Sequence, residues 1–333
     1  MRLDDRLKEL SIQWSVSALI NPINLRDMEE DTWLRTWKPQ YTNIEFERLI
    51  DAYEDVVCHF DEYEFDRKLR DAYISKIRES LKYLYAFKDR DAVKITELHG
   101  TTDTILVSKH HDELLQISDQ VINYSTPEPM CTSDYAKGYL QACIDTMEVP
   151  YIVEQRDIIA RCAVAHKSQK VYVKQDTMYT HGEIKRLQLH ELDVHVARAI
   201  AGKDAGGLFE IGFDNYIELE EGLAVYNEVS TGLKEGLVRT YVRMLACNMC
   251  DNTFEDMVKK LIEQFPRLEN LVYDTCFRIK RGLKDFNDYG GYTKDRLYLS
   301  GYLKVCDLLK EHPEINFKQL IESGKTNFEY WLK

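Results

Sequence analysis

Residues 180–202, THGEIKRLQLHELDVHVARAIAG, are the segment that most narrows what this chain can fold into. Thr180 followed three residues later by Glu183 is typical of a helix start, because both side chains can satisfy backbone N–H groups that lack partners within the helix. Apolar residues after them recur on one helical face. Gly202 stands where a left-handed residue would end the helix. The segment therefore predicts a helix that is packed on one side and carries histidines in its second half.

The two histidines, His190 and His195, are five residues apart, and Glu191 follows the first. Histidines four apart lie about 40° from each other around a helix and can share a metal ion, as in H-E-x-x-H. A spacing of five turns the second ring about 140° away. The pair can therefore share an ion only if the helix unwinds or bulges between them, or ends just before His195. Such bulges concentrate at functional sites.

A catalytic zinc site needs a third protein ligand and an open position for water. The run ELEEGLA, residues 218–224, opens a further helix with Asn215 as its expected cap. Carboxylates are common in a first helical turn because they interact favourably with the helix dipole, which accounts for Glu218 and Glu220. Gly222 is costly inside a helix. It therefore predicts the close approach of another backbone at this point.

HELDVH followed by EEGLA resembles the family of tyrosine/glutamate carboxypeptidases that includes the microtubule-associated tyrosine carboxypeptidases, whose members show H-E-x-x-x-H and then [TQE]-E-G-L-A. Downstream, RIKRG at 278–282 resembles the family's R-x-x-R-G segment. GGYTKDRLYLSG at 290–301 resembles its G-G-x-[FY]-[TS]-K-D-x-x-Y-x-x-G block. Upstream, WKPQY at 37–41 resembles an N-P-x-[FY] element more weakly. The resemblance covers residues 130–310 well and the first hundred residues poorly.

The resemblance implies a role for each matching residue. His190, His195 and Glu221 match the family's metal ligands, so one Zn²⁺ is expected. Glu191 matches its catalytic glutamate, which would take a proton from the zinc-activated water and pass it to the leaving amine. Tyr298 is expected either to donate to the oxyanion or to pack, and the sequence leaves both open.

The match departs from the family between the histidines. Members have small residues there, as in H-E-[IV]-G-T-H, whereas this chain has Leu192, Asp193 and Val194. Asp193 is charged and larger than glycine. It can hydrogen-bond a ligand imidazole or narrow the site, and both alternatives stay open. The departure bears on substrate preference more than on metal binding.

A carboxypeptidase also needs a cation for the terminal carboxylate of its substrate, and the planar fork of arginine suits both oxygens. Arg278, Arg281 and Lys294 lie in the matching motifs and are the candidates. In a zincin-like core, the strand before the active-site helix lines the cleft. Residues 172–174 are therefore expected to pair with an extended substrate, which makes Lys174 a further substrate-binding candidate.

The overall pattern predicts an α+β protein that is mainly helical. Helical spacing dominates the first hundred residues and returns after Thr180, whereas Lys170–Lys174 alternates and predicts a strand. Breaks at 98–102 and 124–129 interrupt the helical pattern. We expect a helical N-terminal region, residues 1–100, and a metallopeptidase catalytic domain, residues 101–333. By the resemblance, that domain is a zincin-like core with a small sheet beside the active-site helix.

Charge and composition exclude several partners. The formal net charge of −13 disfavours binding to nucleic acid and to anionic lipid. No stretch approaches the ~18 apolar residues of a membrane span, and the charged N-terminus lacks the apolar core of a signal peptide. A cytoplasmic protein is expected. In that compartment the 8 cysteines are expected to be buried free thiols, with Cys247 and Cys250 as a core pair.

The expected substrate is the C-terminal tail of a peptide or protein, from which an aromatic residue is removed, as the resemblance implies. Acidic tubulin tails are the family's known animal substrate, and the acidic balance of this chain disfavours them. Three alternatives remain. The same site could belong to an endopeptidase or to an amidohydrolase; the chain could be a non-catalytic interaction protein that keeps the fold; or a helical adaptor could carry HExxxH by coincidence. Intact His190, Glu191, His195 and Glu221 argue against a decayed site.

Overall fold

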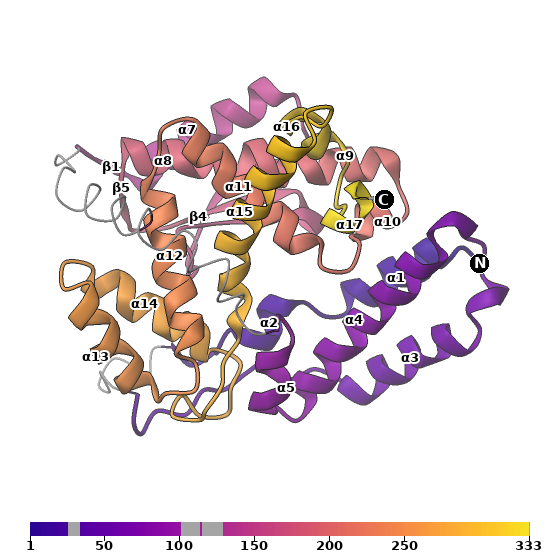
Figure 1. Cartoon of the computed structure of the whole chain (residues 1–333), viewed down its shortest axis with the longest axis horizontal. Coiled ribbons are helices and arrows are strands. Elements are labelled where there is room, and N and C mark those ends of the chain that lie inside the picture. Colours follow the sequence, from indigo (N-terminus) through magenta and orange to yellow (C-terminus); the bar gives the residue numbers. More distant parts are fainter. Residues whose placement is uncertain (26–33, 101–113, 115–128, 333) are drawn as a thin grey trace. The chain divides into compact units, whose positions relative to one another are not determined.

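The computed structural model describes residues 1–25, 34–100, 114 and 129–332. These residues are mainly helical with small sheets, which confirms the α+β class. They fall into two compact units, each built from two stretches of chain. The first unit combines residues 1–110 with 239–297, and the second combines 111–238 with 298–333 (Figure 1). Most of the predicted breaks at 98–102 and 124–129 lies outside the described residues.

This division differs from the expected boundary after residue 100. Residues 239–297, which sequence reasoning assigned to the catalytic domain, pack with the first 110 residues. The motifs at 278–282 and at 290–295 therefore belong to the first unit, whereas His190, His195 and Glu221 belong to the second. Packing between segments that are distant in sequence leaves no local sequence signal that would mark the boundary between the two units.

The described part of the first unit is built mainly from helices. Apolar spacing predicts α3 and α4, which pack on each other and bury Leu49, Ile50 and Tyr53 of α3. α4 begins at Arg70, directly after a 3₁₀ turn that is capped by the side chain of Asp66. The helices of this unit are α1 (Leu3–Ile12), α2 (Val16–Ile20), α3 (Phe46–Cys58), α4 (Arg70–Lys88), α5 (Ala92–Glu97), α13 (Phe254–Gln264), α14 (Glu269–Lys280) and most of α12 (Glu235–Asn248).

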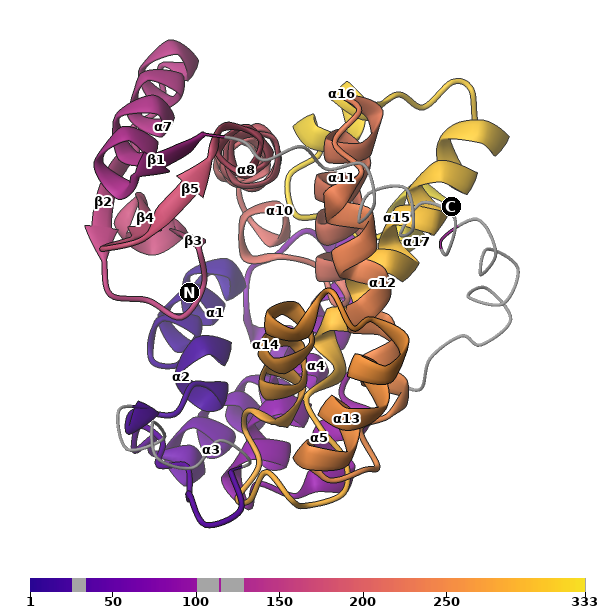
Figure 2. The ribbon, with the colours of Figure 1, turned by 90° about the vertical axis from the view of Figure 1, so that its left-hand side faces the viewer.

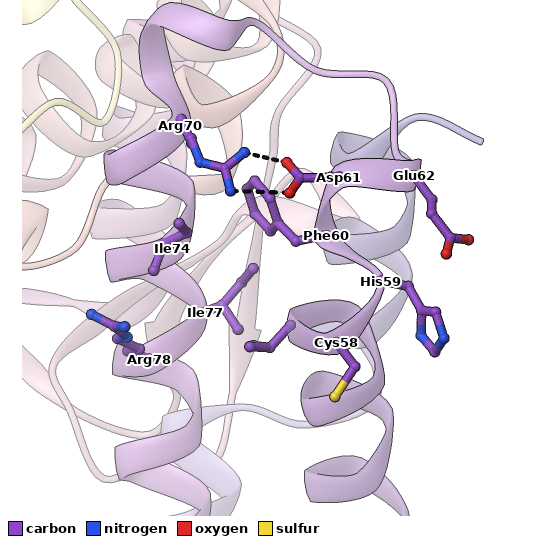
Figure 3. A pocket seen from close by; sticks show the side chains of 10 residues that line it. Cys58, His59, Phe60, Asp61, Glu62, Arg70, Ile74, Ile77 and Arg78 are labelled. Atoms are coloured by element: carbon purple, nitrogen blue, oxygen red, sulfur yellow. Dashed lines mark hydrogen bonds and ion pairs between the residues drawn. The ribbon is translucent and has the colours of Figure 1, made fainter.

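A pocket opens in this unit where the end of α3 faces α4 (Figure 3). Ile74 and Ile77 give it an apolar wall, and an ion pair between Arg70 and Asp61 crosses it. The only described cluster of three potential metal ligands lies elsewhere, in the second unit. This pocket therefore has no part in the candidate metal site.

The second unit contains two small sheets (Figure 2). β1 (Met130–Thr132) pairs antiparallel with β5 (Met178–Thr180), with Met130 opposite Thr180. The other sheet has the order β2-β4-β3, where β2 (Ile152–Arg156) runs parallel to β4 (Lys170–Lys174) and β3 (Cys162–Ala165) runs antiparallel to it. The predicted strand at Lys170–Lys174 is confirmed. Val171 and Val173 point into the core, which agrees with the alternation.

Helices surround this sheet and carry the candidate site. α7 packs on β2 and β4, and its core joins that of the active-site helix through Ile184, Leu187 and Leu192. The helical segments of this unit are α7 (Ser133–Met147), α8 (His181–Leu187), the π-helical segment Gln188–Val196, α9 (Ala197–Ala205), α10 (Leu208–Ile211), α11 (Tyr216–Ser230), most of α15 (Arg296–Glu311), α16 (Phe317–Glu322) and α17 (Phe328–Trp331).

Gly202 does not end the active-site helix, so that expectation is wrong. The helix continues to Ala205, and Gly206 follows with φ 71°. Gly202 lies inside α9. A glycine is required at this position because a Cβ there would stand 2.3 Å from the carbonyl oxygen of Phe209. The glycine at position 202 is therefore explained by a close backbone contact and not by the end of a helix.

Two expectations from composition can be compared with the structure. Cys247 and Cys250 are buried free thiols, as expected, and so are Cys162 and Cys276. The other four cysteines are free but not buried: Cys131, Cys143 and Cys306 are partly exposed, and Cys58 on the last turn of α3 is exposed. Across the described parts of the chain, no helix is both long enough and apolar enough to cross a bilayer.

Candidate metal centre

The two histidines share one side of a helix because the helix widens between them. Residues Gln188–Val196 are π-helical, and the N–H of Ala197 reaches back to the carbonyl of Leu192, five residues earlier. In this geometry, residues five apart lie above one another. The ring centroids of His190 and His195 are accordingly only 5.0 Å apart. Of the alternatives left open by the spacing, the bulge is confirmed.

α11 brings Glu221 to the histidines. It packs directly on the π-helical segment, and Asn215 precedes it in a left-handed conformation without capping through its side chain. Gly222, the next residue, touches Gly301 of α15, and a Cβ at 222 would lie 2.3 Å from the carbonyl carbon of Gly301. The predicted close approach of another backbone at Gly222 is confirmed. This crossing fixes the depth at which Glu221 enters the site.

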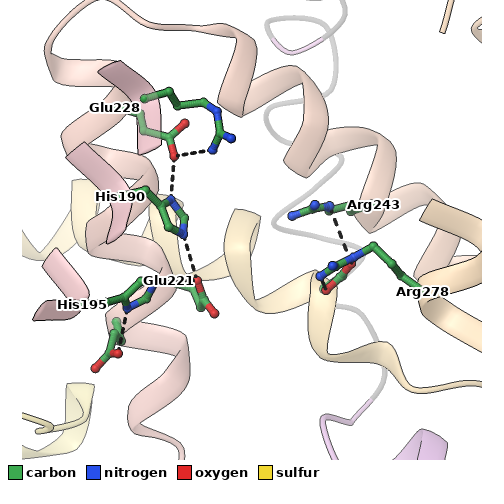
Figure 4. A network of polar contacts seen from close by, with 9 residues as sticks. His190, His195, Glu221, Glu228, Arg243 and Arg278 are labelled. Atoms are coloured by element: carbon green, nitrogen blue, oxygen red, sulfur yellow. Dashed lines mark hydrogen bonds and ion pairs between the residues drawn. The ribbon is translucent and has the colours of Figure 1, made fainter. Parts of the chain in front are cut away.

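The three side chains form a compact donor set. Nε2 of His190 and Nε2 of His195 lie 3.4 and 3.5 Å from Oε2 of Glu221, and one ligand atom from each residue lies within 4.8 Å of the others (Figure 4). Tetrahedral zinc with bonds of about 2.0–2.2 Å places neighbouring ligand atoms about 3.4 Å apart. The donor chemistry and the spacing thus fit a zinc ion with an open fourth position.

Two further glutamates hold the histidine rings. Nδ1 of His190 is 2.6 Å from Oε1 of Glu228, and Nδ1 of His195 is 2.8 Å from Oε1 of Glu220. Ionised carboxylates only accept hydrogen bonds, so both Nδ1 atoms donate, and both Nε2 atoms keep a lone pair for a metal in the neutral rings. Carboxylates that orient histidines in this way are typical of zinc sites.

Two arginines, the fully buried Arg198 and the partly buried Arg186, balance these acids. Arg186 lies 3.5 Å from Glu228, and Arg198 lies 3.4 Å from Glu220. The carboxylates of Glu220, Glu221 and Glu228 and the guanidinium groups of these two arginines sum to one negative charge when both histidines are neutral, without counting Glu191. Burial disfavours charge on His195, but hydrogen bonds to Glu220 and Glu221 outweigh it and hold the pKa of His195 well above 6.5. The site therefore attracts a positive charge, which a proton or a metal ion can supply.

The pKa of the Glu220 carboxyl group is lowered, whereas that of His195 is raised. Burial raises its pKa, but the hydrogen bond from His195 and the charge of Arg198 outweigh burial and lower the pKa to about 2. Glu220 is consequently ionised at neutral pH and able to accept the proton of His195 Nδ1.

Glu191 and Tyr298 lie in the same unit as the donor set. Glu191 follows His190 on the π-helical segment, is half-buried, and makes no hydrogen bond within the described residues. The ring of Tyr298 on α15 stacks with that of His190 at a centroid distance of 6.1 Å. Packing of Tyr298 is therefore observed, while its role as an oxyanion donor stays a prediction.

Asp193 makes no hydrogen bond to either histidine among the described residues, so the first of its two alternatives, a bond to a ligand imidazole, is not observed. Its carboxylate accepts from Gln188 at 3.4 Å, and burial raises its pKa. The π-helical geometry turns residue 193 away from the face that carries His190 and His195.

Lys174 does not lie where a substrate strand could pair. β4 is the central strand of its sheet, with β2 on one side and β3 on the other. Because both edges of β4 are hydrogen-bonded, the expectation that residues 172–174 pair with an extended substrate is wrong. β3 is one of the two outer strands of the described sheet, with β2 at the other edge, and it packs on the π-helical segment.

The three candidate cations belong to the first unit. Arg278 donates two hydrogen bonds, of 2.6 and 2.7 Å, to Asp295. Arg281 is buried and donates to the side chain of Asn21 at 2.6 Å. Lys294 lies in a 3₁₀ turn that precedes α15. Their role towards a substrate carboxylate stays a prediction.

Sequence reasoning missed Glu228 and Arg198 and explained Glu220 by the helix dipole alone. One signal was available, because Glu228 follows Glu221 by seven residues, which is about two helical turns and returns to the same face. No local signal marked Arg198, whose partners are distant in sequence.

Comparison with known proteins shows the family of the chain. The family model described as microtubule-associated tyrosine carboxypeptidase matches residues 48–331. The chain belongs to the microtubule-associated tyrosine carboxypeptidase family. Microtubule-associated tyrosine carboxypeptidase 1 of Mus musculus is 25% identical over 145 residues, which is 42% of this chain and 30% of that protein. The Homo sapiens protein of the same name is 24% identical over the same length and shares.

A second named relative is Putative tyrosine carboxypeptidase MATCAP2 of Mus musculus, which is 36% identical over 70 residues. That match covers 21% of this chain and 13% of the relative. The chain thus spans about a third or less of the length of these family members.

Proposed function

We propose that this chain is a zinc-dependent carboxypeptidase that removes an aromatic C-terminal residue from a peptide or protein tail. The observation that carries the proposal is the donor set of His190, His195 and Glu221, with both histidines held through Nδ1 by carboxylates. The names of the family members, which describe tyrosine carboxypeptidases, support the reaction class and the aromatic residue.

His190, His195 and Glu221 would hold the ion. When bound, zinc supplies a Lewis acid for the scissile carbonyl and lowers the pKa of a water molecule. The chain's own contribution is orientation, because Glu228 and Glu220 keep both rings turned towards Glu221. The surrounding burial excludes bulk water and strengthens each of these charge interactions.

Glu191 would be the general base. Its carboxylate is half-buried and hydrogen-bonds to none of the described side chains, so it can accept a proton from the attacking water. The same carboxyl group would then donate that proton to the amine of the departing residue. A zincin-like core is part of this proposal.

Substrate binding would use an edge strand and a cation. Of the two outer strands of the described sheet, β3 packs on the π-helical segment, and an extended peptide can add to such an edge through main-chain hydrogen bonds. For the terminal carboxylate, Arg278, Arg281 and Lys294 remain the predicted candidates.

Zinc content and peptide trimming test the proposal together. Purified protein should contain about one zinc per chain, and His190→Ala should lose most of it. Mass spectrometry of peptides that differ only in the last residue should show release of Tyr or Phe. Protein that takes up no zinc even after zinc is added, or that trims none of the peptides, would contradict the proposal.

A further inference from the structure

Arg198 is a fully buried charge beside the metal centre. It lies on α9, three residues after His195, and its exposed fraction is 0%. A guanidinium group loses its hydration on burial and is retained only where acceptors and opposite charge replace the water. The partners of Arg198 therefore indicate what the residue does.

Those partners join two distant parts of the second unit. Nη1 donates to the carbonyl of Leu320 at 2.7 Å, and Nη2 donates to the carbonyl of Thr326 at 3.1 Å. On the other side, Nε lies 3.4 Å from Oε2 of Glu220. The other oxygen of Glu220 accepts from Nδ1 of His195 at 2.8 Å. A continuous set of contacts thus runs from residues 320–326 to a metal-ligand candidate.

Residues 320–326 are themselves held firmly to α9 and α10. Gly324, with φ 65°, packs so closely on Gly202 that a Cβ at 324 would lie 2.6 Å from its Cα. The N–H of Lys325 donates to the carbonyl of Phe209, and the N–H of Phe213 donates back to the carbonyl of Lys325. The two carbonyls that accept from Arg198 are therefore fixed in space.

We propose that Arg198 is a positioning residue of the metal centre, which uses the fixed carbonyls of Leu320 and Thr326 to hold Glu220, and through Glu220 the ring of His195. The proposal rests on the proposed zinc site. Arg198 acts on one side of the site, because His190 is held separately by Glu228, which in turn pairs with Arg186. The C-terminal segment consequently contributes to metal affinity without supplying a ligand.

A double-mutant cycle on the full chain tests this role. The four proteins are the wild type, Arg198→Met, Glu220→Gln and the double variant, and the measurements are the Zn²⁺ dissociation constant by chelator competition and the visible spectrum with Co²⁺. Each single variant should bind Zn²⁺ about 10–100-fold more weakly, the range found when groups that orient a ligand are removed. The double variant should bind as Glu220→Gln does, because Arg198 acts through Glu220.

Val305→Ala is the matched control for lost stability. Val305 is fully buried in the cluster that packs α11 against α15 and α16, and its side chain carries no polar group. It should lower stability and leave the Zn²⁺ dissociation constant and the Co²⁺ spectrum unchanged. Equal weakening by Val305→Ala and Arg198→Met would overturn the proposal, because general loosening would then explain both.

Each of the remaining outcomes also tests the positioning role of Arg198. Wild-type affinity in Arg198→Met overturns the positioning role and leaves the zinc site standing. The positioning role is also overturned if the double variant binds Zn²⁺ more weakly than Glu220→Gln by the same factor that separates Arg198→Met from the wild type. If Arg198→Met does not fold, the comparison of Glu220→Gln with the double variant, which buries no unpaired charge, decides in the same way. A wild type that binds no metal overturns the proposed function along with this inference.

Discussion

Gly222 and Gly301 meet where α11 crosses α15, so closely that a Cβ on Gly222 would stand 2.4 Å from the carbonyl oxygen of Gly301. This contact lets Glu221 enter the donor set from one helix while Tyr298 stacks on His190 from the other. The two glycines are therefore part of the site's construction, although neither carries a functional group.

Gly222→Ala should destabilise the protein. The new methyl group overlaps backbone atoms that cannot turn aside, and overpacking of this kind costs about 1–3 kcal/mol. Gly138→Ala on α7 is the control, because nothing lies within 4 Å of its Cβ position. That variant should gain about 0.5–1 kcal/mol from helix propensity. Urea denaturation measures both, and equal stability of the two variants would contradict the role of the crossing.

Glu191→Gln should keep zinc and fold but lose most activity. The amide retains the size of the side chain and removes only its ability to take a proton, which contributes about 10²–10⁴-fold in rate. Zinc content and thermal stability serve as internal controls, and both should match the wild type. Hydrolysis at near wild-type rate would exclude Glu191 as the base.

Asp295 should make the first unit sensitive to acid. Burial opposes its charge, but Arg278 and Arg243 outweigh burial and lower its pKa from 3.8. The unfolded chain then binds more protons than the folded one below that value, so stability falls as pH falls below about 4, by up to ~1.4 kcal/mol per pH unit. Asp295→Asn should flatten this limb of the pH–stability curve. Asp288→Asn, an exposed change, should leave it in place.

Several features of the fold and site follow from local sequence. The alternation at Lys170–Lys174, the close contact at Gly222 and the need for a bulge between His190 and His195 all depend on neighbours along the chain. What local sequence cannot give is which strand lies at an edge. β4 is central because β2 and β3 pair on both sides, and alternation looks alike in central and edge strands.

The polar side chains that hold the histidines in place could not be predicted from the sequence for a related reason. Arg198 contacts carbonyl groups more than a hundred residues away, and main-chain acceptors leave no trace in side-chain identity. Asp193 looked like a partner for an imidazole because it stands between the histidines. The π-helical turn changes which residues share a face, so that proximity in sequence was misleading.

The last prediction separates a carboxypeptidase from an endopeptidase or amidase. If a cation binds the terminal carboxylate, a peptide amidated at its C-terminus should be cleaved far more slowly than the free acid. Losing a buried charged hydrogen bond costs roughly 2–5 kcal/mol, which corresponds to about 30-fold or more in rate. Arginine also fixes where the scissile bond lies, because its fork binds both oxygens.

The responsible cation can be found among Arg278, Arg281 and Lys294 by alanine substitution, with kcat/KM measured on matched acid and amide peptides. The responsible variant should lose rate on the acid and keep its rate on the amide, whereas a variant that merely loosens the fold should lose both equally. Arg281 calls for a stability measurement beside the kinetics, because it is buried and bound to Asn21. Equal cleavage of acid and amide by the wild type would exclude a carboxypeptidase and leave the zinc site to an endopeptidase or amidase.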